Sequence, residues 1–150
     1  MTKIADIYDA IITKIETELP AYSRIPNPYS IDENTAILMR KAYGLAIGAG
    51  SNTERYVGCF ATWERSYTIG LVCQVVNTEN DTVGRAMIEK DIIDAHRLIL
   101  LAFEQDPSLS GQCIKAVITG DTGIQYLAGD NGKFLAVEID LAVELSLIHI

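Results

Sequence analysis

Two histidines and several carboxylates are the side chains of this sequence best suited to acid–base chemistry or metal binding. His96 falls in a helical stretch close to Asp91 and Asp94, but no second histidine lies three or four residues away, as a zinc-binding helix requires. His149 is the second-last residue, a position where chains commonly fray. We therefore predict that His96 lies on a solvated helix face, and we expect no metal and no cofactor.

The closely spaced carboxylates have a simpler explanation than catalysis. Asp91 and Asp94 are three residues apart on one predicted helix, where neighbouring basic residues can offset their charge. Glu104 and Asp106 follow at the end of that helix. General acid–base catalysis needs a positioned partner group, and the sequence offers no nucleophile or base beside either pair. We expect charged surface here and no enzymatic activity.

Two short segments copy parts of known functional loops. Asp121-Thr122-Gly123 has the triplet of aspartic proteases, whose chemistry uses two such aspartates sharing a proton. The next residue is Ile124, where a small residue is expected, and Asp and Gly favour turns, so we predict a turn or bulge. Residues 48–53 begin like a phosphate-binding loop but lack its lysine, so we predict a flexible loop.

Composition and charge exclude several classes of protein. The chain has 150 residues, 49% of them hydrophobic, and 12 basic against 20 acidic residues give a net charge of −8. This predicts one folded domain over residues 1–150 and argues against adhesion to nucleic acid or anionic membrane as the main activity. No apolar stretch approaches the roughly 20 residues of a membrane span. The mean hydropathy of +0.17 is high for so acidic a chain and indicates a large core or apolar surface covered by other subunits.

The three cysteines, Cys59, Cys73 and Cys113, are widely spaced and odd in number. This pattern favours free, mostly buried thiols in a reducing compartment over a disulfide framework.

Hydrophobic periodicity divides the chain into an N-terminal helix (1–19), a Pro-rich connector (20–35) and an α+β body (36–150). Within the body we predict a strand near 42–49 with a Gly- and Asn-rich loop at 48–54, a long or bent strand over 56–76, a polar turn at 77–81, a helix over 82–104, and strands over 112–128 and 133–147. The segment 129–132 predicts a hairpin turn. Two hairpins flanking a central helix predict a mostly antiparallel sheet with both helices on one face.

Two surfaces of these elements are candidates for function. The second half of the central helix is apolar almost all round, so we predict that Leu98, Leu101 and Phe103 contact a second subunit. The last strand alternates strictly, with leucine, valine and isoleucine on one face and Glu138, Asp140 and Glu144 on the other. That acidic face is either a solvated sheet face or a surface shared by several subunits.

The layout resembles the tail terminator, or tail completion, proteins of long-tailed bacteriophages. The resemblance covers most of the chain: an N-terminal amphipathic helix, a Pro-rich connector, a long hairpin, a second helix, and a closing hairpin with an acidic outer face. The resemblance rests on the order of the elements, their lengths and their hydrophobic pattern, because these families carry no short motif to match. It therefore transfers no functional residue.

The resemblance implies a structural virion protein at the head-proximal end of the tail, assembled in the host cytoplasm. It would form a homohexameric ring that caps the tail tube, ends tube growth and gives the head a docking surface. Its partners would be other copies of itself, the tail tube protein and neck or head connector proteins, with DNA passing through the channel without specific binding and no membrane. Neck or head–tail joining proteins are the first alternative, and a small α+β hydrolase or ligand-binding domain is the second.

Overall fold

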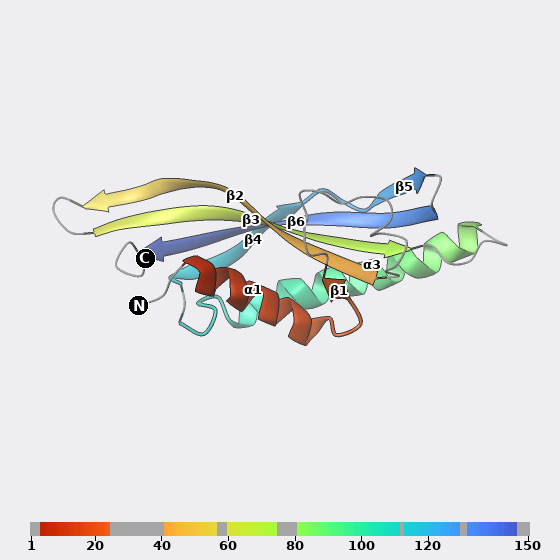
Figure 1. Cartoon of the computed structure of the whole chain (residues 1–150), viewed down its shortest axis with the longest axis horizontal. Coiled ribbons are helices and arrows are strands. Elements are labelled where there is room, and N and C mark those ends of the chain that lie inside the picture. The colour runs from red at the N-terminus through yellow and green to blue at the C-terminus, as the bar shows by residue number, and fades with distance from the viewer. Residues whose placement is uncertain are drawn as a thin grey trace.

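The computed structural model describes residues 4–24, 41–56, 60–74, 81–111, 113–129 and 132–146. In chain order the elements are α1 (Ile4–Glu18), β1 (Ser23–Arg24), β2 (Lys41–Tyr56), β3 (Phe60–Gln74), α3 (Asp81–Gln105), β4 (Lys115–Asp121), β5 (Gln125–Gly129) and β6 (Gly132–Ser146). Within this part of the chain, α1 and α3 pack together on one face of a six-stranded sheet (Figure 1). The fold is α+β, as the sequence predicts.

The sheet consists of two antiparallel hairpins joined side by side. Its order is β1-β2-β3-β6-β4, and β5 also pairs with β6, farther along the same edge as β4. The two hairpins meet where β3 pairs antiparallel with β6 from Thr62↔Ser146 to Gln74↔Phe134. Among the described strands, only β1 is parallel to its neighbour, pairing with β2 at Ala42 and Tyr43.

The core fills the space between the helices and the sheet because each element presents one apolar face to it. In β6 every second residue from Leu135 to Leu145 is buried, and α1 contributes Ile7, Ile11 and Ile15, each at most 1% exposed. Burying one such side chain stabilises the fold by roughly 1.5–3 kcal/mol.

Two tyrosines are among the largest fully buried side chains of this core. The hydroxyl of Tyr43 donates to Oε1 of Glu16 on α1 at 2.9 Å, while the Tyr67 hydroxyl has no hydrogen-bond partner among the described residues. Burial raises the pKa of both hydroxyls, and for Tyr43 the hydrogen bond to Glu16 adds to the effect. Both phenols therefore remain protonated at neutral pH.

The predicted loop at 48–54 is wrong, because β2 continues through it to Tyr56. Instead of a loop, β2 has two register shifts against β3, one between Ile47 and Gly50 and one between Asn52 and Glu54. Gly50 lies so close to Trp63 that an added Cβ would come within 2.9 Å of the indole Cε2. The glycine serves close approach within the sheet, and the resemblance to a phosphate-binding loop has no structural basis.

Most other predicted elements are confirmed with small changes. The helices predicted at 1–19 and 82–104 correspond to α1 and α3, and the strand over 112–128 is divided into β4 and β5 at residues 122–124. The predicted hairpin is confirmed, since Gly129↔Gly132 is the last pair of β5 and β6. Several predictions lie outside the described residues: most of the connector (25–35), the turn at 77–80, Cys59, Leu147 and His149.

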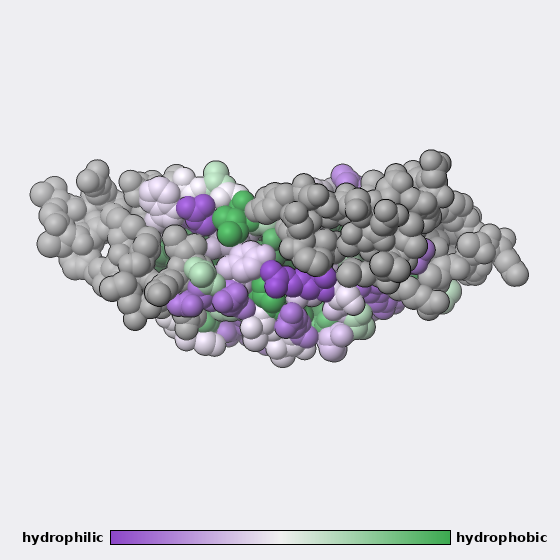
Figure 2. Space-filling view, viewed as in Figure 1, coloured by the Kyte–Doolittle hydropathy of each residue, from purple (hydrophilic) through white to green (hydrophobic). Residues whose placement is uncertain are grey.

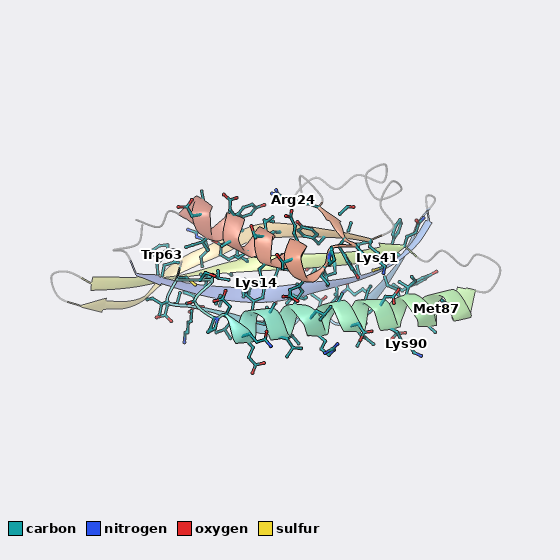
Figure 3. The ribbon with its side chains drawn as sticks, turned by 90° about the horizontal axis from the view of Figure 1, so that it is seen from below. Lys14, Arg24, Lys41, Trp63, Met87 and Lys90 are labelled. Carbon is teal, nitrogen blue, oxygen red and sulfur yellow. The ribbon has the colours of Figure 1, made fainter. Side chains whose placement is uncertain are left out.

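The loop after α3 is held to α1 by a single carboxylate. Asp106 Oδ1 accepts the backbone N–H of Ser110 at 2.9 Å, and Oδ2 accepts the ammonium of Lys14 at 3.1 Å. Leu109, Ser110 and Gly111 have φ values of 50°, 59° and 87°, a left-handed conformation that costs roughly 1–2 kcal/mol for each non-glycine residue. Figure 3 shows Lys14 between α1 and α3.

Candidate functional site

The predicted acidic residues stand on the sheet face opposite to α1 and α3. Glu138 and Asp140 are exposed, and they alternate along β6 with buried Val137, Ile139 and Leu141. Glu144 is less exposed, at 24% of its side chain, and its Oε2 lies 3.6 Å from Nζ of Lys115 on β4. We call this surface the acidic face. The sequence prediction for its three carboxylates is confirmed in position.

Small residues surround the two exposed carboxylates of the acidic face. Glu138 pairs across the sheet with Gly70, and Asp140 pairs with Thr68. A Cβ added at Gly70 would meet nothing within 4 Å, so no neighbouring side chain covers the backbone at this position. The face therefore presents negative charge on a shallow backbone surface.

The three residues predicted for a subunit interface on α3 differ in exposure. Leu101 is 38% exposed, and Leu98 is half-buried against the core. Phe103 is only 1% exposed, so it belongs mainly to the core of its own chain and offers almost no surface to a second subunit. The periodicity of a helix that is apolar all round does not reveal which of its sides faces the sheet.

Further apolar side chains reach the surface near the end of the sheet at β4. Leu100 and Ile93 on α3 are 38% and 51% exposed, and Val117 on β4 is 44% exposed. Ile93 and Leu100 are seven residues apart and so share one side of the helix, which the sequence shows only once the buried side is known. In Figure 2, green hydrophobic residues reach the surface among purple hydrophilic ones.

A groove of about 450 Å³ runs between the end of α3 and β4. Its lining consists of Leu100, Phe103, Glu104, Pro107, Ala116, Val117 and Ile118. Most of these side chains are apolar, and the groove opens at the edge of the sheet. Its composition suits an apolar side chain or segment better than a charged ligand.

Two residues that the sequence places far apart meet at the other end of β4. Nε2 of His96 lies 3.5 Å from Oδ2 of Asp121, without hydrogen-bond geometry. His96 is 21% exposed, so the predicted solvated face is wrong. Asp121 also behaves as the predicted turn residue, because Oδ1 accepts the N–H of Gly123 at 2.8 Å and Gly123 has φ 74°. A carboxylate beside an imidazole can orient a general base.

The remaining carboxylates with possible chemistry are structural or exposed. Asp91 lies 3.6 Å from Lys41 of β2, so it joins α3 to the sheet, and Asp94 is exposed. Backbone hydrogen bonding from Ser110, followed by the contact with Lys14, holds the pKa of Asp106 below its ordinary value. This carboxylate is therefore ionised at neutral pH and stabilises the loop.

Cys73 and Cys113 are free and buried, as the sequence predicts for these two thiols. Burial raises the pKa of both, to about 11 for Cys113. Among the described residues, no cluster of three histidine, cysteine, aspartate or glutamate side chains could hold a metal ion. Neither described helix is long and apolar enough to cross a membrane.

Comparison of the chain with protein-family models and with curated protein sequences found no match.

Proposed function

We propose that this chain is the subunit of a structural ring in a virus particle, most closely a tail terminator of a long-tailed bacteriophage. The observation that carries the proposal is the exposure of apolar side chains at both ends of the sheet. Ile47 on β2 is 39% exposed, and Val117 on β4 is 44% exposed. A ring built from head-to-tail contacts uses two different patches on every subunit, and these two positions supply one each.

The acidic face suits the wall of a DNA channel. Glu138 and Asp140 are exposed on it, and the net charge of the chain is −8. Like charge opposes binding of the phosphate backbone, so DNA would pass such a wall without adhering. The proposed partners are other copies of the chain, the tail tube protein and the head connector.

The mass of the purified protein in solution tests the ring directly. Light scattering or native mass spectrometry across a concentration series should give a closed hexamer near six times 16.4 kDa, and electron microscopy should show rings. A protein that stays monomeric at all concentrations, and also when preformed tail tubes are added, would contradict the proposal.

Binding to purified particles separates the terminator from its nearest alternative. A terminator should cap one end of assembled tail tubes and stop their growth when added during assembly. A neck or head–tail joining protein should instead bind the connector of filled heads and leave tube growth unchanged.

A reversed-charge variant tests the channel wall. Glu138→Lys with Asp140→Lys should keep the hexamer but make the ring retain DNA in a low-salt gel-shift assay. Asp9→Lys with Asp94→Lys, which changes the net charge equally at exposed helix positions, is the matched control. Equal DNA retention by both double variants would show that net charge, and not the acidic face, governs adhesion.

A further inference from the structure

One side of α3 carries a row of exposed apolar and charged side chains. Ile93 is 51% exposed and Leu100 is 38% exposed, and both lie on the same side of the helix because they are seven residues apart. Arg97 and Glu104 are also exposed, and each follows one of these apolar residues by four positions, so the four side chains are neighbours. We call them the α3 stripe. Figure 3 shows α1 along one side of α3 and no further helix of the described residues along the other.

The α3 stripe borders the groove beside β4. Leu100 and Glu104 both line this groove, together with Pro107 at its end and Ala116 on β4. The lining is mostly apolar, with the carboxylate of Glu104 among it. A partner that covers the groove must therefore bring apolar side chains to Leu100 and a basic group to Glu104.

The two charges of the α3 stripe are not neutralised within the described part of the chain, where no ion pair involves Arg97 or Glu104. Arg97 comes three residues before Leu100, and Glu104 comes four residues after it. At 1.5 Å per residue, the two charges lie about 4.5 Å and about 6 Å from Leu100 in opposite directions along the helix axis. The stripe thus has an apolar centre between a positive and a negative charge.

This arrangement is its own complement. If a second copy of α3 runs antiparallel with a two-fold axis at Leu100, the Leu100 side chains of the two copies meet. Arg97 then lies within one residue of Glu104 of the second copy, and the reverse pair forms by symmetry. Ile93 comes opposite Pro107, at the end of the groove. Each apolar side chain meets an apolar surface, and each charge meets its opposite.

Two other arrangements of the α3 stripe lack this match. An antiparallel pair with its axis midway between Ile93 and Leu100 also joins the apolar residues, but it places Arg97 against Arg97 of the second copy. A parallel pair places Arg97 against Arg97 and Glu104 against Glu104. Like charges in contact oppose association. Of the three arrangements, only the antiparallel one at Leu100 satisfies both the apolar residues and the charges.

We propose that the α3 stripe binds the α3 stripe of a second copy of this chain, antiparallel and about a two-fold axis at Leu100. This inference goes beyond the proposed ring and does not rest on it. Head-to-tail contacts build the ring, whereas a two-fold contact closes on itself at two copies. The free chain in dilute solution is therefore a dimer that covers the exposed apolar side of α3.

Charge exchange between two variants tests this contact. Arg97→Glu and Glu104→Arg each place two like-charge pairs in the dimer and should raise its dissociation constant at least about tenfold. Mixed in equal amounts, the two variants should bind each other with the wild-type dissociation constant, because every pair across the axis then joins opposite charges. Analytical ultracentrifugation of dilute protein, with one variant carrying a fluorescent label, measures both quantities.

Asp94→Arg is the matched control for the charge exchange. Asp94 is exposed on α3 but lies outside the α3 stripe, and its replacement changes the net charge as Glu104→Arg does. The control should keep the wild-type dissociation constant.

The outcomes of the charge exchange separate this inference from the proposed ring. A wild-type chain without dimers at any concentration below that of ring formation, or single variants that do not bind each other when mixed, would overturn the α3 contact and leave the ring standing. Dimers that obey the charge exchange but never form rings, with or without tail tubes, would refute the ring and support the α3 contact.

Cross-linking at adjacent positions tests the register. In a Cys59→Ser background, Leu100→Cys should give a covalent dimer with a short bismaleimide, because position 100 lies at the two-fold axis; the thiols of Cys73 and Cys113 are buried. Leu101→Cys is the matched control, since Leu101 is equally exposed at 38% but points about 100° away around the helix. The control should remain monomeric on a denaturing gel. Equal cross-linking at both positions, or a covalent dimer from Leu101→Cys alone, would overturn the proposed register.

Discussion

Replacing Asp106 with alanine is expected to lower the free energy of unfolding by about 2 kcal/mol. The carboxylate accepts the backbone N–H of Ser110 at 2.9 Å and the ammonium of Lys14 at 3.1 Å. A hydrogen bond to a charged acceptor contributes about 1.5 kcal/mol, and a partly exposed ion pair contributes about 0.5 kcal/mol. At 2–4 °C per kcal/mol for a chain of this length, the melting temperature should fall by about 4–8 °C.

Asp106→Asn separates the two contributions. The amide oxygen can still accept the N–H of Ser110, but the charge that attracts Lys14 is lost, so we expect about half the destabilisation of the alanine variant. Urea unfolding followed by circular dichroism measures both variants, at two protein concentrations because assembly stabilises the folded state. Asp94→Asn, at an exposed position on α3, is the control and should leave stability unchanged within about 0.5 kcal/mol.

The pH dependence gives a further check on Asp106. Its pKa is lower in the folded state than the ordinary value of 3.8, so its stabilising contribution is fully present above that value. The contribution is lost as the pH falls through the folded-state pKa, because the carboxyl then protonates. The difference between wild type and Asp106→Asn should therefore shrink below pH 4. An equal difference at pH 7 and pH 2.5, or a loss under 0.5 kcal/mol for Asp106→Ala, would refute the assigned role.

Three other predictions concern the sheet, the thiols and the carboxylate next to the histidine. Gly70→Thr should raise the free energy of unfolding by about 0.5–1 kcal/mol, because nothing lies within 4 Å of an added Cβ and glycine weakens strand interiors. Gly50→Ala should lower the free energy of unfolding, because the indole of Trp63 occupies the space that a Cβ at position 50 would need. Cys73 and Cys113 should resist iodoacetamide at pH 8 in the folded protein and react after addition of urea, since burial raises the pKa of both thiols; peptide mass spectrometry identifies the modified sites. Asp121→Asn should leave any hydrolytic background of the preparation unchanged, whereas loss of a measurable esterase or peptidase activity would favour an enzyme.

The strands and helices with strict periodicity were predictable from the sequence. The alternation of β6 correctly separates the buried residues from Glu138 and Asp140, since a period of two assigns each side chain to one face. The spacing of isoleucines in α1 likewise predicts its buried side. In both elements one face is polar enough to show which side points to solvent and which side points to the core.

The prediction fails where one residue type serves two purposes or where partners are distant in sequence. Gly50 indicates a loop by composition, yet the structure uses it for close approach to Trp63 within the sheet. Phe103 lies in a stretch of α3 that is apolar all round, so only the packing shows that it faces inward. The contact of His96 with Asp121 joins residues from α3 and β4, and no local pattern predicts it.

The alternation of β6 also determines how this gene should tolerate mutation. Between Leu135 and Leu145, substitutions at odd positions enter the core and should reduce the amount of folded protein. Substitutions at Glu138 and Asp140 should leave protein abundance unchanged and, under the function proposed above, affect only the yield of infectious particles. In a saturation mutagenesis library scored separately for abundance and for fitness, a single strand of 15 residues would thus yield two interleaved selection profiles. Natural sequence variation should follow the same period of two. At the odd positions we expect exchange among similar apolar residues, and at the two acidic positions the side-chain size should vary while the negative charge is kept.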